Sequence, residues 1–199
     1  MPTISRLFDD YASAKQALRA LVANGIPEAD ISIVANNSDN FYNERSNLVD
    51  RDNDDVEGAA ETAGGVGAVA GGAVGLLTGL GIMAIPGVGP VVAAGWLATT
   101  ALGALAGGAA GSIIGALVES GVPEQDAHVY AEGLRRGGVL LTVRTDSATP
   151  TNIERIIDKY AVDTRARGDD YRRTGWKNFD ETSSPYTADQ IRAERDLRL

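Results

Sequence analysis

The sequence predicts an α+β protein: a small ferredoxin-like α/β sandwich with an antiparallel helical hairpin inserted in its middle. Three observations lead to this prediction. Short strand-like and helix-like segments alternate at both ends of the 199-residue chain. Between them, residues 62–118 contain no Asp, Glu, Lys or Arg, although 23% of the whole chain is charged. Two prolines and two glycines in residues 85–90 divide this charge-free region into two helix-length arms.

The first half of the α/β domain, residues 1–35, is expected to form a β-α-β unit. Alternating residues at its start are typical of a short strand. Asp9 or Asp10 is placed to cap the following helix, because a carboxylate accepts hydrogen bonds from the free N–H groups of a first turn. Gly25 is a typical residue at a helix C-terminus, and the β-branched residues after it predict the second strand.

An acidic linker, residues 36–57, is expected to follow. It is rich in Asn, Asp, Ser and Arg, and seven of its residues are acidic against two basic. Three aspartates and a later glutamate around its end have the spacing of a calcium loop. However, Asp55 stands where the turn glycine of such a loop belongs. A solvated linker is therefore the preferred interpretation, and no metal site is predicted.

Residues 58–120 are expected to form a glycine-zipper helical hairpin with arms at 58–84 and 91–120. Small residues recur every four positions in each arm, so each helix would present a smooth face on which another helix packs closely. Each glycine in a helix costs about 1 kcal/mol relative to alanine, which indicates that the pattern serves packing. The residues predicted to pack are Gly67, Gly71, Gly75, Gly79, Gly103, Gly107, Gly111 and Gly115. The predicted turn comprises Pro86, Gly87, Gly89 and Pro90.

Residues 121–165 are expected to complete the α/β domain in the order helix, strand, helix, strand, with the helices on one face of the sheet. A proline and acidic residues open the first helix, and two glycines end it. An apolar run predicts the next strand, and residues 161–165 are the predicted last strand. The polar tail, residues 166–199, is expected to be mostly irregular, with a short helix at 187–197.

Composition argues against several classes of function. The net charge of −9 and the pI near 4.6 disfavour a nucleic-acid partner, because such binding depends on Lys and Arg that neutralise phosphates. The chain has no cysteine, which excludes disulfides, thiolate metal sites and a cysteine nucleophile. The one histidine, His128, is interpreted as a surface or boundary residue. No catalytic, cofactor-binding or metal-binding residues are predicted, and the protein is expected not to be an enzyme.

The charge-free arms need to be buried against something, and three arrangements compete. They are packing of the arms on their own sheet, association with other copies of the chain, and insertion into a bilayer. A small sheet offers too little surface to cover both faces of such long arms. The arms are long enough to cross a bilayer, but acidic residues flank them, whereas membrane spans prefer basic flanks. A cytoplasmic homo-oligomer assembled through the hairpin is predicted, and a membrane-associated protein is the alternative.

Two parts of the sequence together resemble a known family. They are the glycine zipper with its turn at 84–90, and residues 121–140, which include the run EGLRRGGVL at 132–140. These resemble the bacterial general stress protein family that contains the heat-induced stress protein domain. The resemblance covers residues 3–165, and the run at 132–140 is its most specific part. It implies a stress-associated cytoplasmic protein and supplies no catalytic residues.

Overall fold

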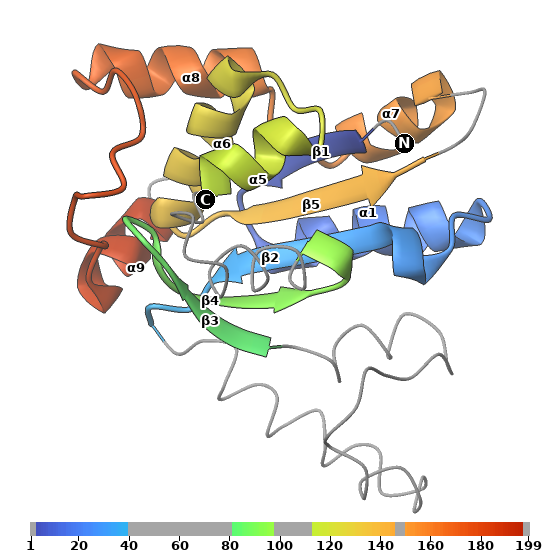
Figure 1. The fold of residues 1–199 in the computed structure, drawn as a ribbon, viewed down its shortest axis with the longest axis horizontal. Helices are drawn as coiled ribbons and strands as arrows, with labels where there is room; N and C mark the ends of the chain where they lie inside the picture. Colours follow the sequence, from blue (N-terminus) through green and yellow to red (C-terminus); the bar gives the residue numbers. More distant parts are fainter. Residues whose placement is uncertain (1–2, 40–80, 98–112, 146–149, 197–199) are drawn as a thin grey trace, which may run out of the picture.

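Strands from both ends and from the middle of the chain form one antiparallel sheet. The computed structural model describes residues 3–39, 81–97, 113–145 and 150–196. Within these residues the sheet has five strands in the order β1-β5-β2-β4-β3 (Figure 1). The strands are β1 (Thr3–Phe8), β2 (Ile31–Asn36), β3 (Gly81–Ile85), β4 (Gly89–Ala94) and β5 (Val139–Arg144). The predicted mixture of helices and sheet is therefore confirmed.

Helices cover both faces of this sheet. They are α1 (Tyr11–Ala23), α5 (Ile113–Glu119), α6 (Glu124–Arg135), α7 (Pro150–Asp158), α8 (Thr164–Arg173) and α9 (Ala188–Asp196), with a short 3₁₀ helix, Glu28–Asp30, before β2. The α1 and α7 helices pack on one face, whereas α5 and α6 pack on the other, where α8 lies against α6 (Figure 1). The prediction that the helices cover one face is wrong, because α6 packs on the face opposite α1 and α7, where α5 from the charge-free region adds to the apolar layer.

The predicted β-α-β unit at the start of the chain is confirmed. Asp10 caps α1, because its carboxylate accepts a hydrogen bond from the Ser13 backbone N–H at 2.8 Å. Gly25 follows the end of the helix with φ +85°, a conformation that glycine adopts without steric cost. The β1 and β2 strands run parallel to each other, because both pair antiparallel with β5, which lies between them.

The β3–β4 hairpin corrects the helical prediction at residues 81–84 and 91–94, the inner ends of the two predicted arms; residues 58–80 and 98–112 of these arms lie outside the described residues. Gly81 pairs with Ala93 at the open end of the hairpin, and β4 pairs with β2. The chain turns at residues 86–88, within the predicted turn, but it joins two strands instead of two helices, and Gly89 and Pro90 begin β4. A short apolar run fits a buried strand as well as a helix, so its periodicity does not distinguish them. Within the part of the second arm that the structure describes, residues 96–97 are helical and α5 is a helix of seven residues.

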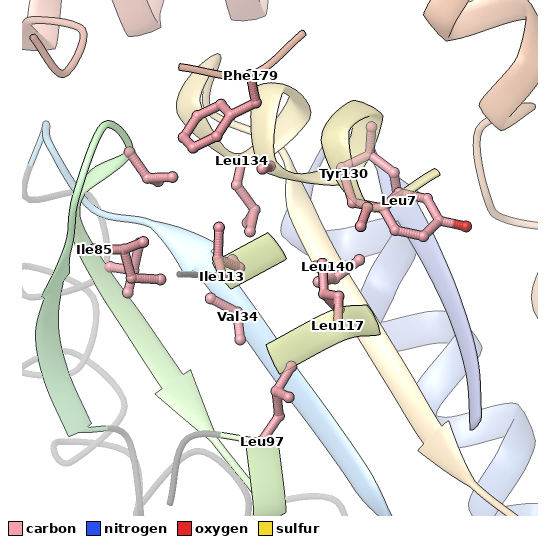
Figure 2. Packing of buried hydrophobic residues seen from close by; sticks show 14 of the residues in the cluster. Leu7, Val34, Ile85, Leu97, Ile113, Leu117, Tyr130, Leu134, Leu140 and Phe179 are labelled. Carbon is pink, nitrogen blue, oxygen red and sulfur yellow. The ribbon is translucent and has the colours of Figure 1, made fainter. Parts of the chain in front are cut away.

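Two apolar clusters lie on opposite faces of the sheet. The cluster under α1 and α7 includes Phe8, Leu21, Ile31, Leu141 and Ile157. The cluster under α5 and α6, seen in Figure 2, includes Leu7, Val34, Leu117, Leu134, Leu140 and Phe179. Successive residues of β5 point into alternate clusters, as expected for a strand. Because both faces are covered, β5 is buried from Val139 to Val143.

The chain after α7 differs from the predicted last strand at 161–165. The Val162 backbone N–H donates to the Leu7 carbonyl oxygen at 2.8 Å, at the outer edge of β1, but the chain then leaves the sheet. Asp163 caps α8, which begins at the next residue. The α8 helix also corrects the prediction of a tail that starts as an irregular segment, whereas α9 confirms the short helix predicted at 187–197.

The α6 helix lies very close to β1 at Gly133. A Cβ atom on Gly133 would stand 2.4 Å from Leu7 Cδ2, so a side chain does not fit without movement of Leu7. One turn earlier, the Tyr130 hydroxyl donates to the Ser5 carbonyl oxygen at 2.7 Å, and burial raises the pKa of this hydroxyl. The close contact and the hydrogen bond together fix the position of α6 on the sheet.

Replacing Gly133 with alanine is expected to lower the free energy of unfolding by about 1–3 kcal/mol, because the added methyl group overpacks the contact with Leu7. This loss outweighs the gain of about 1 kcal/mol in helix propensity. Chemical denaturation of G133A, L7A and the double variant measures the coupling. In the L7A background the same substitution should be neutral or stabilising, and an equal loss in both backgrounds would show that Leu7 is not the cause.

Candidate functional site

In the described residues, the candidate site is the contact between the end of α6 and the C-terminal part of the chain. Within the described ranges there is no group of three or more His, Cys, Asp or Glu residues arranged to hold a metal ion. Among the helices that the structure describes, none is long and apolar enough to cross a membrane. Polar and aromatic side chains gather at the end of α6, residues 132–138. The C-terminal segment, residues 174–196, lies against this end.

The glycines at the end of α6 allow the chain to turn and allow α9 to pack closely against this helix end. The Gly138 backbone N–H donates to the Gly133 carbonyl oxygen at 2.9 Å, and the Gly137 N–H donates to Leu134 O at 3.0 Å. Gly137 has φ +92°, and this combination is the Schellman arrangement of a helix C-terminus. A Cβ atom on Gly137 would stand 2.9 Å from Ile191 Cγ2. The glycine therefore lets α9 approach the end of α6.

A buried ion pair within the end of α6 lies beside the C-terminal segment. The side chain of Glu132 is 1% exposed, and the Arg136 Nε donates to its carboxylate at 2.6 Å. The Arg136 guanidinium also contacts Glu194 at 3.3 Å and lies over the ring of Tyr171, 4.6 Å from the ring centroid. Burial alone would lower the pKa of Arg136, but the hydrogen bond and the charge of Glu132 outweigh this effect. The pKa of Arg136 is therefore raised above its ordinary value. Arg136 is therefore a permanent positive charge between α6, α8 and α9.

Asn36 connects the same helix end to the sheet and to the hairpin turn. Its side chain is completely buried at the end of β2. The Nδ2 group donates to Leu134 O at 3.0 Å and to Val88 O at 3.3 Å, while Oδ1 accepts from the Ser38 N–H at 2.9 Å. One side chain thus donates hydrogen bonds to a buried carbonyl oxygen at the end of α6 and to one in the β3–β4 turn. Buried carbonyl groups need such a partner within the protein.

Two of the predicted turn residues, Gly87 and Gly89, lie against the C-terminal segment. A Cβ atom on Gly87 would stand 2.9 Å from Phe179 Cζ, and one on Gly89 would stand 2.9 Å from Pro185 Cβ. The Phe179 side chain belongs to the apolar cluster beside Leu134, between α6 and the hairpin (Figure 2). The turn is therefore covered by the C-terminal segment of the same chain.

Three polar contacts hold this segment in place. The Phe179 N–H donates to Nδ1 of His128 at 3.2 Å, and Arg135 donates to the Ser184 carbonyl oxygen at 3.0 Å. Arg195 forms an ion pair with Asp39, just after β2. These contacts come from α6, the C-terminal segment and the end of β2.

The other predicted site residues are placed as follows. Pro86 and Pro90 are exposed on the hairpin, and Gly115 is exposed on α5. The remaining predicted packing residues, Gly67, Gly71, Gly75, Gly79, Gly103, Gly107 and Gly111, lie outside the described residues. Sequence reasoning missed Asn36, Glu132 and Phe179 as parts of one site. The run at 132–140 identified the region, but nothing in it indicated that the tail packs there.

Comparison with protein-family models, curated proteins and solved structures finds no match for this chain. The site is therefore interpreted from its own chemistry. Its buried carboxylate is held by arginine, its carbonyl groups are capped by an amide, and its apolar surface is covered by Phe179. Such an arrangement is suited to holding one segment of the chain on another.

Replacing Arg136 with methionine is expected to lower the free energy of unfolding by about 3–5 kcal/mol, because it leaves the Glu132 carboxylate buried without its closest partner. The matched control is Arg192→Met on α9, where the pair with Asp189 is 60% and 91% exposed. The control should stay within about 0.5 kcal/mol of the unmodified protein. Urea denaturation of both variants checks the difference, and equal losses would contradict the role given to Arg136.

Asn36→Asp is expected to destabilise the protein more than Asn36→Ala, which should cost about 1–3 kcal/mol. A carboxylate at this position would face the carbonyl oxygens of Leu134 and Val88 and be desolvated. The extra cost should shrink as the pH falls and the carboxyl group becomes protonated. Denaturation at pH near 4 and near 7 measures this change, and a pH-independent difference would contradict the proposed contacts.

Proposed function

We propose that this protein is a non-enzymatic structural protein that assembles with copies of itself through its charge-free region. The position of the β3–β4 hairpin is the observation that carries the proposal. This hairpin lies in the middle of the charge-free region and forms the edge of the sheet within the described residues. Gly81, where the hairpin begins, pairs with Ala93 near its end, and Leu97 follows shortly after. The chain therefore enters and leaves the hairpin at the same end.

The edge strand itself favours association. Natural edge strands usually carry charges or prolines that prevent pairing with another chain. The sequence of β3, GIMAI, contains neither. Within the described residues, β4 is its partner on one side. An edge strand without charge or proline, beside two charge-free stretches, is consistent with a region that is covered by other copies of the chain in its working form.

The small-residue pattern supports the same proposal from the sequence. The strands found at 81–85 and 89–94 leave residues 62–80 and 98–112 as the stretches that carry most of the four-residue repeat of glycine. Such repeats allow close approach of backbones in helix packing. We propose that these stretches pack against their counterparts in other copies, with the α/β domains displayed outside.

The α/β domain is proposed to be a variant of the ferredoxin-like plan. In that plan two parallel strands joined by a helix are separated by a third, antiparallel strand. The β1, α1 and β2 elements have this arrangement around β5. The contact of Val162 with β1 lies where the fourth strand of the plan would be. Together with the resemblance of residues 132–140 to stress proteins, this supports a stress-associated protein of the cytoplasm.

Replacing both Gly71 and Gly107 with leucine is expected to break the assembly, because larger side chains prevent close approach of the packed stretches. The matched control replaces both residues with alanine, which keeps the surface small. Light scattering after size-exclusion chromatography measures the particle mass. The leucine variant should lose the high-mass particle or precipitate, whereas the alanine variant should keep it.

An unchanged particle mass in the leucine variant would contradict assembly through these residues. A monomeric unmodified protein would contradict the proposal altogether. The alternative, a membrane-associated protein, is distinguished by separating the lysate into soluble and membrane fractions before the measurement. Recovery only from membranes, with release by detergent, would favour that alternative.

A further inference from the structure

The contact between Phe179 and His128 depends on the protonation of the imidazole. Nδ1 of His128 accepts a hydrogen bond from the Phe179 backbone N–H at 3.2 Å. A neutral imidazole has one nitrogen that accepts, but a protonated imidazole donates at both nitrogens and accepts at neither. Protonation would therefore place two N–H groups against each other in a partly buried contact. The docked segment requires His128 to be neutral.

Phe179 is the main apolar anchor at the start of the C-terminal segment. Its side chain is 6% exposed and lies in the cluster formed by α6 and the hairpin. The neighbouring chain, from the end of α8 to the start of α9, is irregular and has no ladder of backbone hydrogen bonds to the sheet. The contact with His128 and the burial of the ring hold Phe179 itself, while Arg135 at Ser184 and Arg136 at Glu194 hold the chain further along.

We propose that protonation of His128 releases the C-terminal segment from α6. The protonated imidazole no longer accepts the hydrogen bond of the Phe179 N–H. The Phe179 ring then leaves the apolar cluster, and the β3–β4 turn becomes exposed. Docking is accordingly favoured at neutral and alkaline pH and opposed by acid. The surface uncovered on release includes Gly87 and Val88 of the turn and the side of Leu134 on α6. The segment remains tethered through α8 on one side and α9 on the other.

Charged groups lie on each of the elements around His128 except the hairpin. On α6, Glu124 and Glu132 lie one turn away on either side, and Arg136 already binds Glu132. On α8, Arg172 pairs with Asp169. Residues 81–97 of the hairpin contain no charged residue, and α5 contributes Glu119 at its end.

On the C-terminal segment, Lys177 and Asp180 flank Phe179. Hydrogen bonds from the Thr182 hydroxyl and backbone N–H and from the Ser183 hydroxyl lower the pKa of Asp180, which therefore stays ionised while an imidazole titrates. Carboxylates and lysines ordinarily titrate well outside the interval of about pH 5–8 in which imidazoles change charge.

The test follows the Phe179 amide by NMR between about pH 8 and pH 5.5, the interval in which imidazoles ordinarily titrate. In the unmodified protein its protection from hydrogen exchange, corrected for intrinsic rates, should fall about tenfold or more as the pH decreases. In His128→Asn the side-chain oxygen replaces Nδ1 as the acceptor and does not titrate, so protection should persist at the lower pH. His128→Ala has no acceptor and should show low protection throughout.

A second readout uses Trp176, three residues before Phe179. In a Trp96→Phe background Trp176 is the only tryptophan, and its fluorescence should shift towards that of exposed indole as the pH falls. The same shift in His128→Asn would overturn the proposal, because carboxylates would then cause the release. Constant protection of Phe179 in the unmodified protein down to pH 5.5, or full protection in His128→Ala at pH 8, would also overturn it. Amides of β5 report whether each variant is folded.

Discussion

The pairing of β5 between β1 and β2 is the interaction on which the rest of the structure depends. It joins the two ends of the α/β domain, since Leu7 pairs with Leu140 and Val34 also pairs with Leu140 on the other side. Each face of β5 contributes to a different apolar cluster, so both layers of helices rest on this strand. Without it, β1 would be separated from the sheet that β2 forms with β4 and β3, and the apolar layer under α1 would lose its central strand.

The polar residues at the end of α6 contribute more to the specificity of the packing there than to the free energy of unfolding. A buried ion pair such as Glu132 with Arg136 contributes little net stability relative to apolar residues of the same size, because both charges lose their hydration. It does penalise any arrangement in which one partner is left alone. Asn36 acts in the same way, since its donors match carbonyl oxygens on two different elements. Together they fix the end of α6 relative to β2 and the β3–β4 turn, and the C-terminal segment packs against this end.

Sequence reasoning succeeded where local signals were sufficient. The cap at Asp10, the glycine at 25 and the apolar runs of β2 and β5 each predicted the correct element. It failed at β3 and β4, because an apolar run without polar residues has no period, and its conformation is decided by the free edge of β2. Residues 161–165 have strand-like composition, but Asp163 starts a helix there. The site was found only in part, because His128 and Phe179 are 51 positions apart and meet through tertiary packing.

The distance along the chain between β2 and β5 has a consequence for synthesis on the ribosome. Ala35 pairs with Val139, so the strand that completes the sheet emerges roughly a hundred residues after the unit that needs it. At typical translation rates this interval lasts about 5–20 s. During that time the apolar face of α1 and the whole charge-free region are outside the ribosome without β5. The apolar residues that pack on β5 therefore stay without this strand until late in synthesis, and the sheet is completed only then.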